Sequence, residues 1–303
     1  MIGSACSAIN FWIIENESNG ELAPFPKRSI TDLQRSKTLS QRNAPLFPNA
    51  TLNALLAGFN ESFGLAADQV DHAIWPNPFA SSSSGVPRDL NLVDGSEAGQ
   101  VLPLWSQIQP ARTSSLIIAW DDNPDAQPYQ WLNGTSVHNT YLAAKAAGLP
   151  FPVVPPPSTM LNKNFTLRPT FFGCDAALTT TGTAESPIVL YMANAPYSAY
   201  TNYTWTQSTF SEGQMYEIFD NAFNAFTQGN GTLDSEWPEC LGCAVVERSL
   251  EKVGLRRTEQ CERCFERYCW DGTYDDRVPE ILDPSLPLVP GLSFAEWNAT
   301  SWI

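Results

Sequence analysis

The stretch "SLIIAWDD" at residues 115–122 decides the fold class. Its apolar residues run without alternation and stop at two aspartates, which is typical of a parallel strand buried on both faces. The later segments "PTFFGC" (169–174) and "PIVLYMANAP" (187–196) have the same character. Strands buried on both faces need a helical layer on each side of their sheet. The stretch therefore predicts a layered α/β fold.

Helical patterns lie between and after these strands, and glycines end several of them. We expect a layered α/β fold with a mainly parallel sheet, in a single domain that covers residues 1–303. The proline-rich segment 148–159 is interpreted as a loop inside that domain, because strands of the same type continue beyond it. The predicted helices are 1–18, 51–64 with Thr51 as a cap, 140–149, 212–229 and 243–254.

Composition and charge narrow the class of protein. The chain has 303 residues, of which 43% are hydrophobic, so it can bury a sizeable core. Its formal net charge of −15 argues against a nucleic-acid partner, since binding to phosphates needs a basic surface. No stretch approaches the roughly 18 apolar residues of a membrane span.

The asparagines indicate the compartment. Eight of the twenty stand in Asn-x-Ser/Thr sequons, where chance would give about three. This excess predicts a secreted, glycosylated protein that is extracellular or associated with a cell wall. The eight are Asn16, Asn49, Asn60, Asn133, Asn164, Asn202, Asn230 and Asn298.

The first residues, "MIGSACSAINFWIIENES", do not have the pattern of a signal peptide, because no basic segment precedes the apolar stretch and polar residues interrupt it. A secreted glycoprotein without an export signal leads us to expect that the chain has lost its beginning.

Six of the seven cysteines follow residue 170, and four form "CLGC" (240–243) and "CERC" (261–264). Two such pairs also match the ligand spacing of a zinc ribbon. Because the sequons indicate an oxidising compartment, and because a fifth cysteine lies close by, we favour disulfides. The odd total leaves one thiol free or paired with a segment outside the chain. The disulfide candidates are Cys174, Cys240, Cys243, Cys261, Cys264 and Cys269, five of them in a cysteine-rich segment at 240–275.

The usual catalytic patterns of serine hydrolases are missing from the sequence. His72 and His138 are the only histidines, which makes a Ser-His-Asp triad improbable, and no G-x-S-x-G elbow is present. Asp94 is the remaining candidate. It ends the apolar run of "LNLVDGSEAGQ" (90–100) and precedes Gly95, at the position where open α/β sheets place catalytic groups. The alternative is that Asp94 and Gly95 only form a tight turn.

Seven stretches together resemble the fungal secreted lysophospholipase, or phospholipase B, family, which shares its catalytic domain with cytosolic phospholipase A2. The similarity runs from about residue 71 to 290. It rests on "LNLVDGSEAGQVLPL", "IQPAR", "NGTS", "RPTFFGCDA", "PIVLYMANAPYS", "TQGNGTLDSEWPECLGCAVVERSLEK" and "CERCFERYCWDGTY".

This resemblance implies a serine–aspartate dyad that hydrolyses fatty-acyl esters of phospholipids and lysophospholipids. Asp94 matches the family's aspartate, which takes the serine proton, while backbone amides beside an arginine hold the oxyanion. No cofactor is implied, and contact with the membrane surface is expected to be transient.

The sequence also departs from the family pattern. The family's serine lies in a G-x-S-G-G elbow well before the aspartate, and these 303 residues contain no such motif. The family's Asn-Ile-Pro-Leu is replaced by Val101–Leu104, which removes one polar group. We therefore expect the C-terminal portion of a lysophospholipase catalytic domain, inactive by itself. The alternative is a non-catalytic secreted glycoprotein with the same scaffold. The sequence leaves acyl-chain and position preference, oligomeric state and disulfide connectivity open.

Overall fold

A computed structural model describes residues 73–80, 85–92, 99–123, 126, 128–183, 185–203, 207 and 209–300. The chain divides into two compact units, residues 1–101 and 102–303, and each is described by itself. The predicted helices at 1–18 and 51–64 lie outside the described residues.

The described part of the first unit is a β-hairpin. Strand β1 (Ala73–Pro76) pairs antiparallel with β2 (Asp89–Leu92). Trp75 and Leu92 are exposed on it. The apolar run before Asp94 predicted a buried strand, and this interpretation was wrong. The sequence Asp-Leu-Asn-Leu alternates polar and apolar residues, as half-exposed antiparallel strands do, and is not a continuous apolar run.

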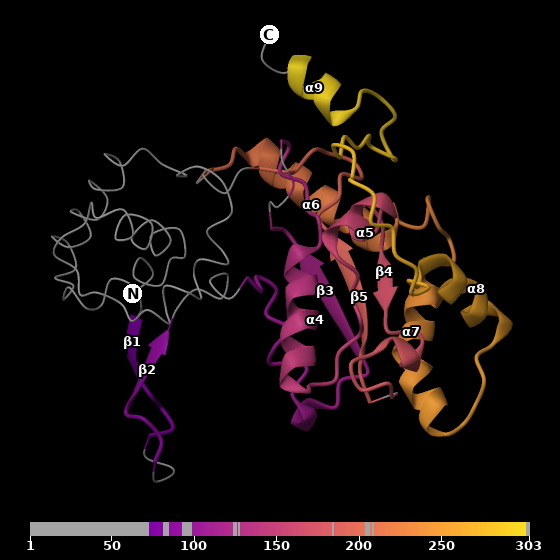
Figure 1. Ribbon diagram of the computed structural model, residues 1–303. Coiled ribbons are helices and arrows are strands. Elements are labelled where there is room, and N and C mark those ends of the chain that lie inside the picture. Colours follow the sequence, from indigo (N-terminus) through magenta and orange to yellow (C-terminus); the bar gives the residue numbers. More distant parts are fainter. Residues whose placement is uncertain are drawn as a thin grey trace, which may run out of the picture. The chain divides into compact units, whose positions relative to one another are not determined.

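The second unit is built on a three-stranded sheet with the order β3-β5-β4 (Figure 1). Strand β3 (Leu116–Asp121) runs parallel to β5 (Ile188–Ala193), while β4 (Thr170–Phe172) runs antiparallel to β5. All three predicted strands are present. The mixed α/β class is confirmed, but the described sheet contains one parallel and one antiparallel pairing.

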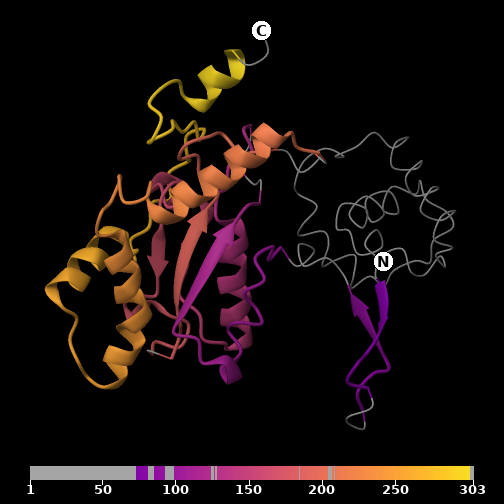
Figure 2. The same cartoon turned by 180° about the vertical axis from the view of Figure 1, so that it is seen from behind.

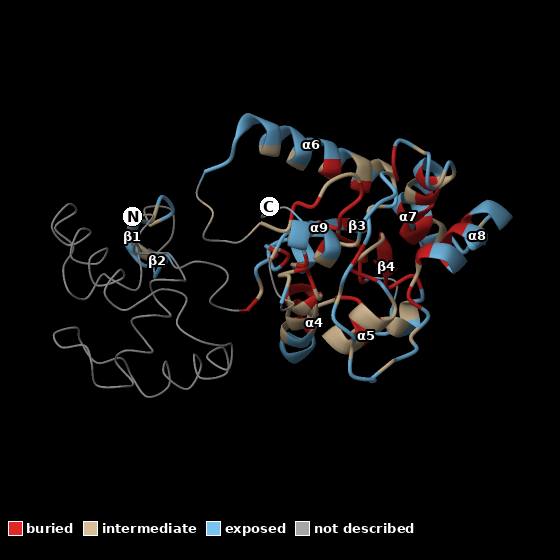
Figure 3. Ribbon diagram, turned by 90° about the horizontal axis from the view of Figure 1, so that it is seen from above, coloured by how far each residue is buried: buried red, intermediate tan, exposed pale blue. Residues whose placement is uncertain are grey.

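Helices cover both faces of this sheet (Figures 1 and 2). On one face, Val189 and Tyr191 of β5 pack with residues of α4 (Thr135–Ala147) and α5 (Pro157–Asn162). On the other face, Ile188, Leu190 and Met192 pack against α7 (Trp237–Lys252) and α8 (Glu259–Tyr268). The alternation follows from the two-residue period of a strand. Burial is concentrated in the strands and in the helix turns that face them (Figure 3).

The remaining helices lie at the ends of the sheet. Helix α6 (Glu212–Thr227) begins with a capping box between Ser211 and Gln214, and α9 (Phe294–Thr300) is close to the C-terminus. Two short 3-10 helices are Pro110–Arg112 and Ala176–Leu178.

Gly148 ends α4 with φ of 66°, as its position in the sequence predicts. Among the described residues, no helix has the length and apolar character needed to cross a membrane.

Three disulfides connect the cysteine-rich segment. Cys240–Cys264 and Cys243–Cys261 join α7 to α8, and Cys174–Cys269 joins the end of β4 to the end of α8. The cysteines of α7 and of α8 stand three residues apart, so each pair presents both sulfurs on one side of its helix. The helical hairpin is thereby held against the face of the sheet.

The disulfides differ in the loops that they close. Cys174–Cys269 spans 95 residues, whereas Cys243–Cys261 spans 18 and lies beside a second bridge across the same helical hairpin. We expect the double substitution Cys174→Ser/Cys269→Ser to lower the free energy of unfolding by at least ~1–2 kcal/mol more than Cys243→Ser/Cys261→Ser, since the longer loop constrains the unfolded chain more. Urea denaturation of both variants measures this. Equal losses would contradict it.

Candidate functional site

Carboxylates gather where the two parallel strands end. Asp121 is the last residue of β3, Asp122 follows it, and Asn194 follows the last residue of β5. Because the strands are parallel, both carboxyl ends reach the same edge of the sheet, which is the edge where α/β proteins place their ligand-binding groups. Helix α6 lies across this edge (Figures 1 and 2).

Asp121 is completely buried. Its Oδ2 accepts a hydrogen bond of 2.8 Å from the hydroxyl of Tyr191, and its Oδ1 accepts one of 3.3 Å from the backbone N–H of Asn123. Burial raises the pKa of Asp121 from 3.8 to about 6, because a charge is poorly solvated there; the two hydrogen bonds offset part of this rise, and the charge of Asp122 adds to it. Asp121 is therefore a carboxyl group that can take up a proton at mildly acidic pH.

Asp122 begins a second set of hydrogen bonds. Its Oδ1 accepts from Nδ2 of Asn194 at 2.7 Å, while burial raises its pKa and this bond opposes the rise. Oδ1 of Asn194 in turn accepts from the hydroxyl of Thr201 at 3.0 Å. The end of β3 is thus linked to the end of β5 through side chains.

Asn221, buried in the middle of α6, fixes the loop that follows β5. Its Oδ1 accepts from the backbone N–H groups of Tyr197 at 2.7 Å, Ser198 at 3.0 Å and Ala199 at 3.3 Å. Its Nδ2 donates to the carbonyl oxygen of Ala195 at 2.9 Å. These bonds satisfy backbone groups of a buried loop and hold α6 at the edge of the sheet. The outward side of the helix keeps large apolar side chains such as Phe219 and Phe223 exposed.

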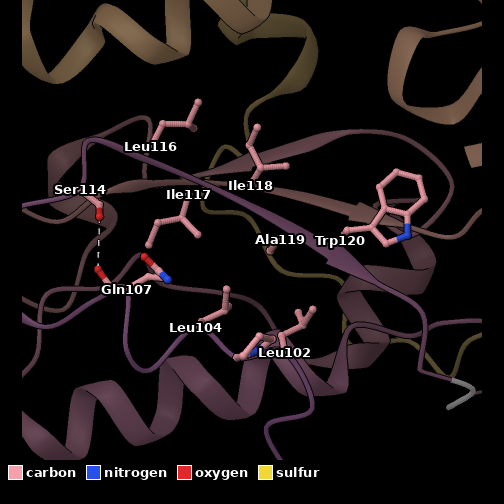
Figure 4. A pocket seen from close by; sticks show the side chains of 10 residues that line it. Leu102, Leu104, Gln107, Ser114, Leu116, Ile117, Ile118, Ala119 and Trp120 are labelled. Carbon is pink, nitrogen blue, oxygen red and sulfur yellow. Dashed lines mark hydrogen bonds between the residues drawn. The ribbon is translucent and has the colours of Figure 1, made fainter. Parts of the chain in front are cut away.

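A groove of about 460 Å³ runs along β3 (Figure 4). Ile117 and Ala119 point toward Leu102 and Leu104 on its other wall. That wall is anchored, because the backbone N–H of Leu102 donates to Oγ of Ser136 in the first turn of α4 at 2.9 Å. In this segment Leu102 and Leu104 are buried beside β3, whereas Val101, which stands in place of the family's asparagine, is 39% exposed.

Some of the site residues predicted from the sequence lie within the described residues, and others do not. Asp94, His72, Asn16, Asn49 and Asn60 lie outside the described residues. His138 is a structural residue by its contacts, since its Nδ1 lies 2.9 Å from the carbonyl oxygen of Val154 and its ring packs on Tyr141.

The five described sequon asparagines are not buried. Asn164 and Asn230 are exposed, and Asn133, Asn202 and Asn298 are partly exposed. All six disulfide candidates are paired, and the paired residues include both Cys-x-x-Cys motifs that also fitted a zinc ribbon.

Sequence reasoning used Asp121 and Asp122 only as the end of a strand and missed Tyr191, Asn194 and Asn221. The signal that could have found them is a buried strand that stops at acids beside a second strand that stops at an asparagine. Their grouping depends on the pairing of β3 with β5, which the linear sequence does not contain.

The comparisons with known proteins identify the class and then the family. A mixed α/β domain with carboxyl groups at the carboxyl edge of its sheet is a common form of enzyme domain. The sequence profile of the lysophospholipase catalytic domain matches residues 37–275, and the chain belongs to this family.

Named relatives agree with this assignment. Lysophospholipase 3 of Aspergillus fumigatus is 38% identical over 235 residues, which cover 74% of this chain and 37% of the relative. The lysophospholipase of Penicillium chrysogenum is 37% identical, and the matched region covers 82% of this chain and 41% of the relative. Lysophospholipase 2 of Candida albicans is 33% identical, and the matched region covers 90% of this chain and 41% of the relative. The chain thus spans about two fifths of these relatives. No solved structure matches it significantly.

The buried position of Asp121 predicts a pH-dependent stability. The folded state holds the proton more tightly than the unfolded state, so the free energy of unfolding should fall as pH rises from about 4 to about 6 and stay flat above. The interval between 3.8 and about 6 corresponds to roughly 3 kcal/mol. Asp121→Asn should weaken this fall, because the amide carries no charge at any of these pH values.

Urea denaturation at pH 4 to 7.5 measures the effect. Asp276→Asn is the control, since Asp276 is exposed and should leave the pH profile unchanged. A profile for Asp121→Asn that parallels the wild type would contradict the prediction.

Proposed function

We propose that this chain is the aspartate-bearing portion of a lysophospholipase, in which Asp94 is the general base of a serine–aspartate dyad and the serine belongs to a segment outside these 303 residues. The observation that carries the proposal is the match of residues 37–275 to the lysophospholipase catalytic domain, a range that contains Asp94. Membership of this family supports a hydrolase that acts on ester bonds.

The chemistry needs one base and one nucleophile. The serine hydroxyl would attack the acyl carbon while its proton passes to the carboxylate of Asp94, and the C–O bond to glycerol would then break as the leaving oxygen regains a proton. Water would cleave the acyl-serine by the same route in a second step. The scarcity of histidine suits this chemistry, because His138 is engaged with Val154 and Tyr141.

The substrates follow from the family. Phospholipids and lysophospholipids are proposed as the substrates, with the membrane surface as a transient contact. The net charge of −15 disfavours nucleic acid and also anionic surfaces in general. A zwitterionic choline headgroup fits an acidic protein better than an anionic lipid does.

We also propose that the protein is a secreted glycoprotein. The excess of sequons, the exposed or partly exposed positions of the described ones and the three disulfides support this together. Asn164 and Asn230 are the best described acceptors. Both are exposed, and both have positive φ angles, 55° and 54°, which asparagine tolerates at loop positions.

The general-base role predicts the outcome of a reconstruction. The chain alone should not hydrolyse lysophosphatidylcholine. Fusing the segment of A. fumigatus lysophospholipase 3 that precedes the matched region to the N-terminus of this chain should restore hydrolysis. Asp94→Asn in that fusion should lower kcat by at least ~10²-fold, since an amide does not accept the serine proton.

Asp89→Asn is the matched control. Asp89 is exposed, lies five residues before Asp94 and should leave kcat unchanged. Release of fatty acid is measured, and circular dichroism verifies folding. Full activity of a folded Asp94→Asn fusion would reduce Asp94 to a turn residue and favour the non-catalytic glycoprotein.

Glycosylation predicts a change in mass. After expression in a secreting fungal host, Asn230→Gln and Thr232→Ala should each lower the molecular mass by one glycan, because both destroy the same sequon while Thr232→Ala keeps the asparagine. Intact-protein mass spectrometry before and after enzymatic deglycosylation measures this. A wild-type protein whose mass does not change on deglycosylation would contradict the secreted assignment.

A further inference from the structure

Strand β3 has a free side. In the order β3-β5-β4 it is an edge strand, and the carbonyl oxygens of Ser115 and Asp121 accept from β5 and from the residue after it. Since backbone groups alternate direction along a strand, the N–H and C=O groups of Leu116, Ile118 and Trp120 point to the side away from β5. Within the described parts of the chain, no strand occupies that side.

The other edge of the sheet is closed. Phe171 of β4 forms a parallel bridge with Cys269, and the backbone N–H of Trp270 donates to the carbonyl oxygen of Phe171 at 3.0 Å. The disulfide Cys174–Cys269 holds this covering segment in place. In the described residues, the β4 edge of the sheet is therefore covered by another segment, whereas the β3 edge is not.

The free edge lacks the features that protect natural edges. Proteins place lysines, prolines, charges or bulges on exposed edge strands to prevent unwanted pairing. Residues 116–120 are all apolar, and the side chain of Ile118, in the middle of the strand, is 46% exposed. Parallel strands are also normally covered on both faces and seldom left at the surface. The composition of this edge is that of a strand in the interior of a sheet.

A groove lies beside this edge. The groove of about 460 Å³ follows β3 from Leu116 to Trp120, and the anchored leucines Leu102 and Leu104 form its other wall (Figure 4). None of the eight sequons lies between residues 102 and 121 or in α7 and α8.

We propose that β3 pairs through this edge with a β-strand from the part of the lysophospholipase that this chain does not span. The relatives supply the reason for this occupant, since the matched region covers only 37% to 41% of their length. The paired strand extends the sheet beyond β3 and fills the groove. The inference rests on the proposed function in so far as both assign the missing segment to the same enzyme.

Hydrogen exchange at single residues tests the edge directly. In the chain alone, the amides of Leu116, Ile118 and Trp120 should exchange at least 100-fold faster than those of Ile117, Ala119 and Asp121, which face β5. In the fusion described above, the three edge amides should slow by at least 100-fold. Slow exchange of the edge amides in the chain alone would overturn the proposal, because the edge would then be covered within the chain or by a second copy.

A proline substitution tests the pairing without disturbing the existing ladder. Ile118→Pro removes an N–H that points to the free side, where proline is tolerated, whereas the bonds to β5 come from the neighbouring residues. The fusion is built with a protease site at the junction. After cleavage, the two parts should co-elute with Ile118 or with the control Ile118→Val, and should separate with Ile118→Pro. Co-elution of the folded Ile118→Pro parts would overturn the proposal.

The results separate this inference from the proposed function. Parts that stay together through a protected edge but show no hydrolysis would leave the edge pairing standing and reject the activity. Hydrolysis by a fusion whose edge amides still exchange fast would support the activity and reject the edge pairing. If the fusion does not fold, the same exchange is measured on the aligned strand of intact A. fumigatus lysophospholipase 3, where unprotected alternate amides would overturn the pairing.

Discussion

Complete burial of β5 is the constraint on which the second unit depends. All six residues from Ile188 to Ala193 are buried, so each face of the strand must be covered by its own apolar layer. One face requires α4 and α5, and the other requires α7 and α8. The positions of the disulfides follow from this need. Helix α8 buries only one side, around Cys261, Cys264 and Phe265, and two disulfides join it to α7. Covalent bonds thus complete a layer that apolar area alone would hold weakly.

At the carboxyl edge of the sheet, in contrast, burial of a polar group costs free energy. A buried carboxyl group such as Asp121 is unfavourable in its charged form, and the hydroxyl of Tyr191 compensates only in part. Nearby, Asn221 uses both ends of its amide on buried backbone groups and neighbours. Such fully engaged polar groups position a loop more sharply than apolar packing does. Directional hydrogen bonds from Asn221 therefore fix the loop after β5 where α6 crosses the edge.

Sequence alone located the three strands of this unit and the helices α4, α6 and α7, because continuous apolar runs and terminal glycines are local signals, whereas α5, α8 and α9 were not predicted. The direction of β4 was not available in the same way. Three residues, Thr170–Phe172, carry no mark of parallel or antiparallel pairing, which follows from the connections and from the Cys174–Cys269 bridge. The start of α7 at Trp237 instead of Cys243 could have been found, since Pro238 in the first turn is a start signal. The pairing of cysteines and the meeting of Asp121 with Tyr191 depend on contacts between segments far apart in the chain. Asp94 stays a prediction.

The two edges of the sheet connect these observations to the family. At β4 the chain closes its own sheet with a covalently held segment, and no further element is needed there. At β3 it leaves apolar residues and unpaired backbone groups in the described structure, beside a groove whose wall is already fixed to α4. A chain that folded as an isolated unit would gain from charges at such an edge, because they prevent association. Their absence makes sense if the edge is normally an interior position. The chain matches a catalytic domain over residues 37–275 and spans only about two fifths of its relatives. Under the proposed pairing, the side of the sheet next to β3 is where the remaining part of such an enzyme would join.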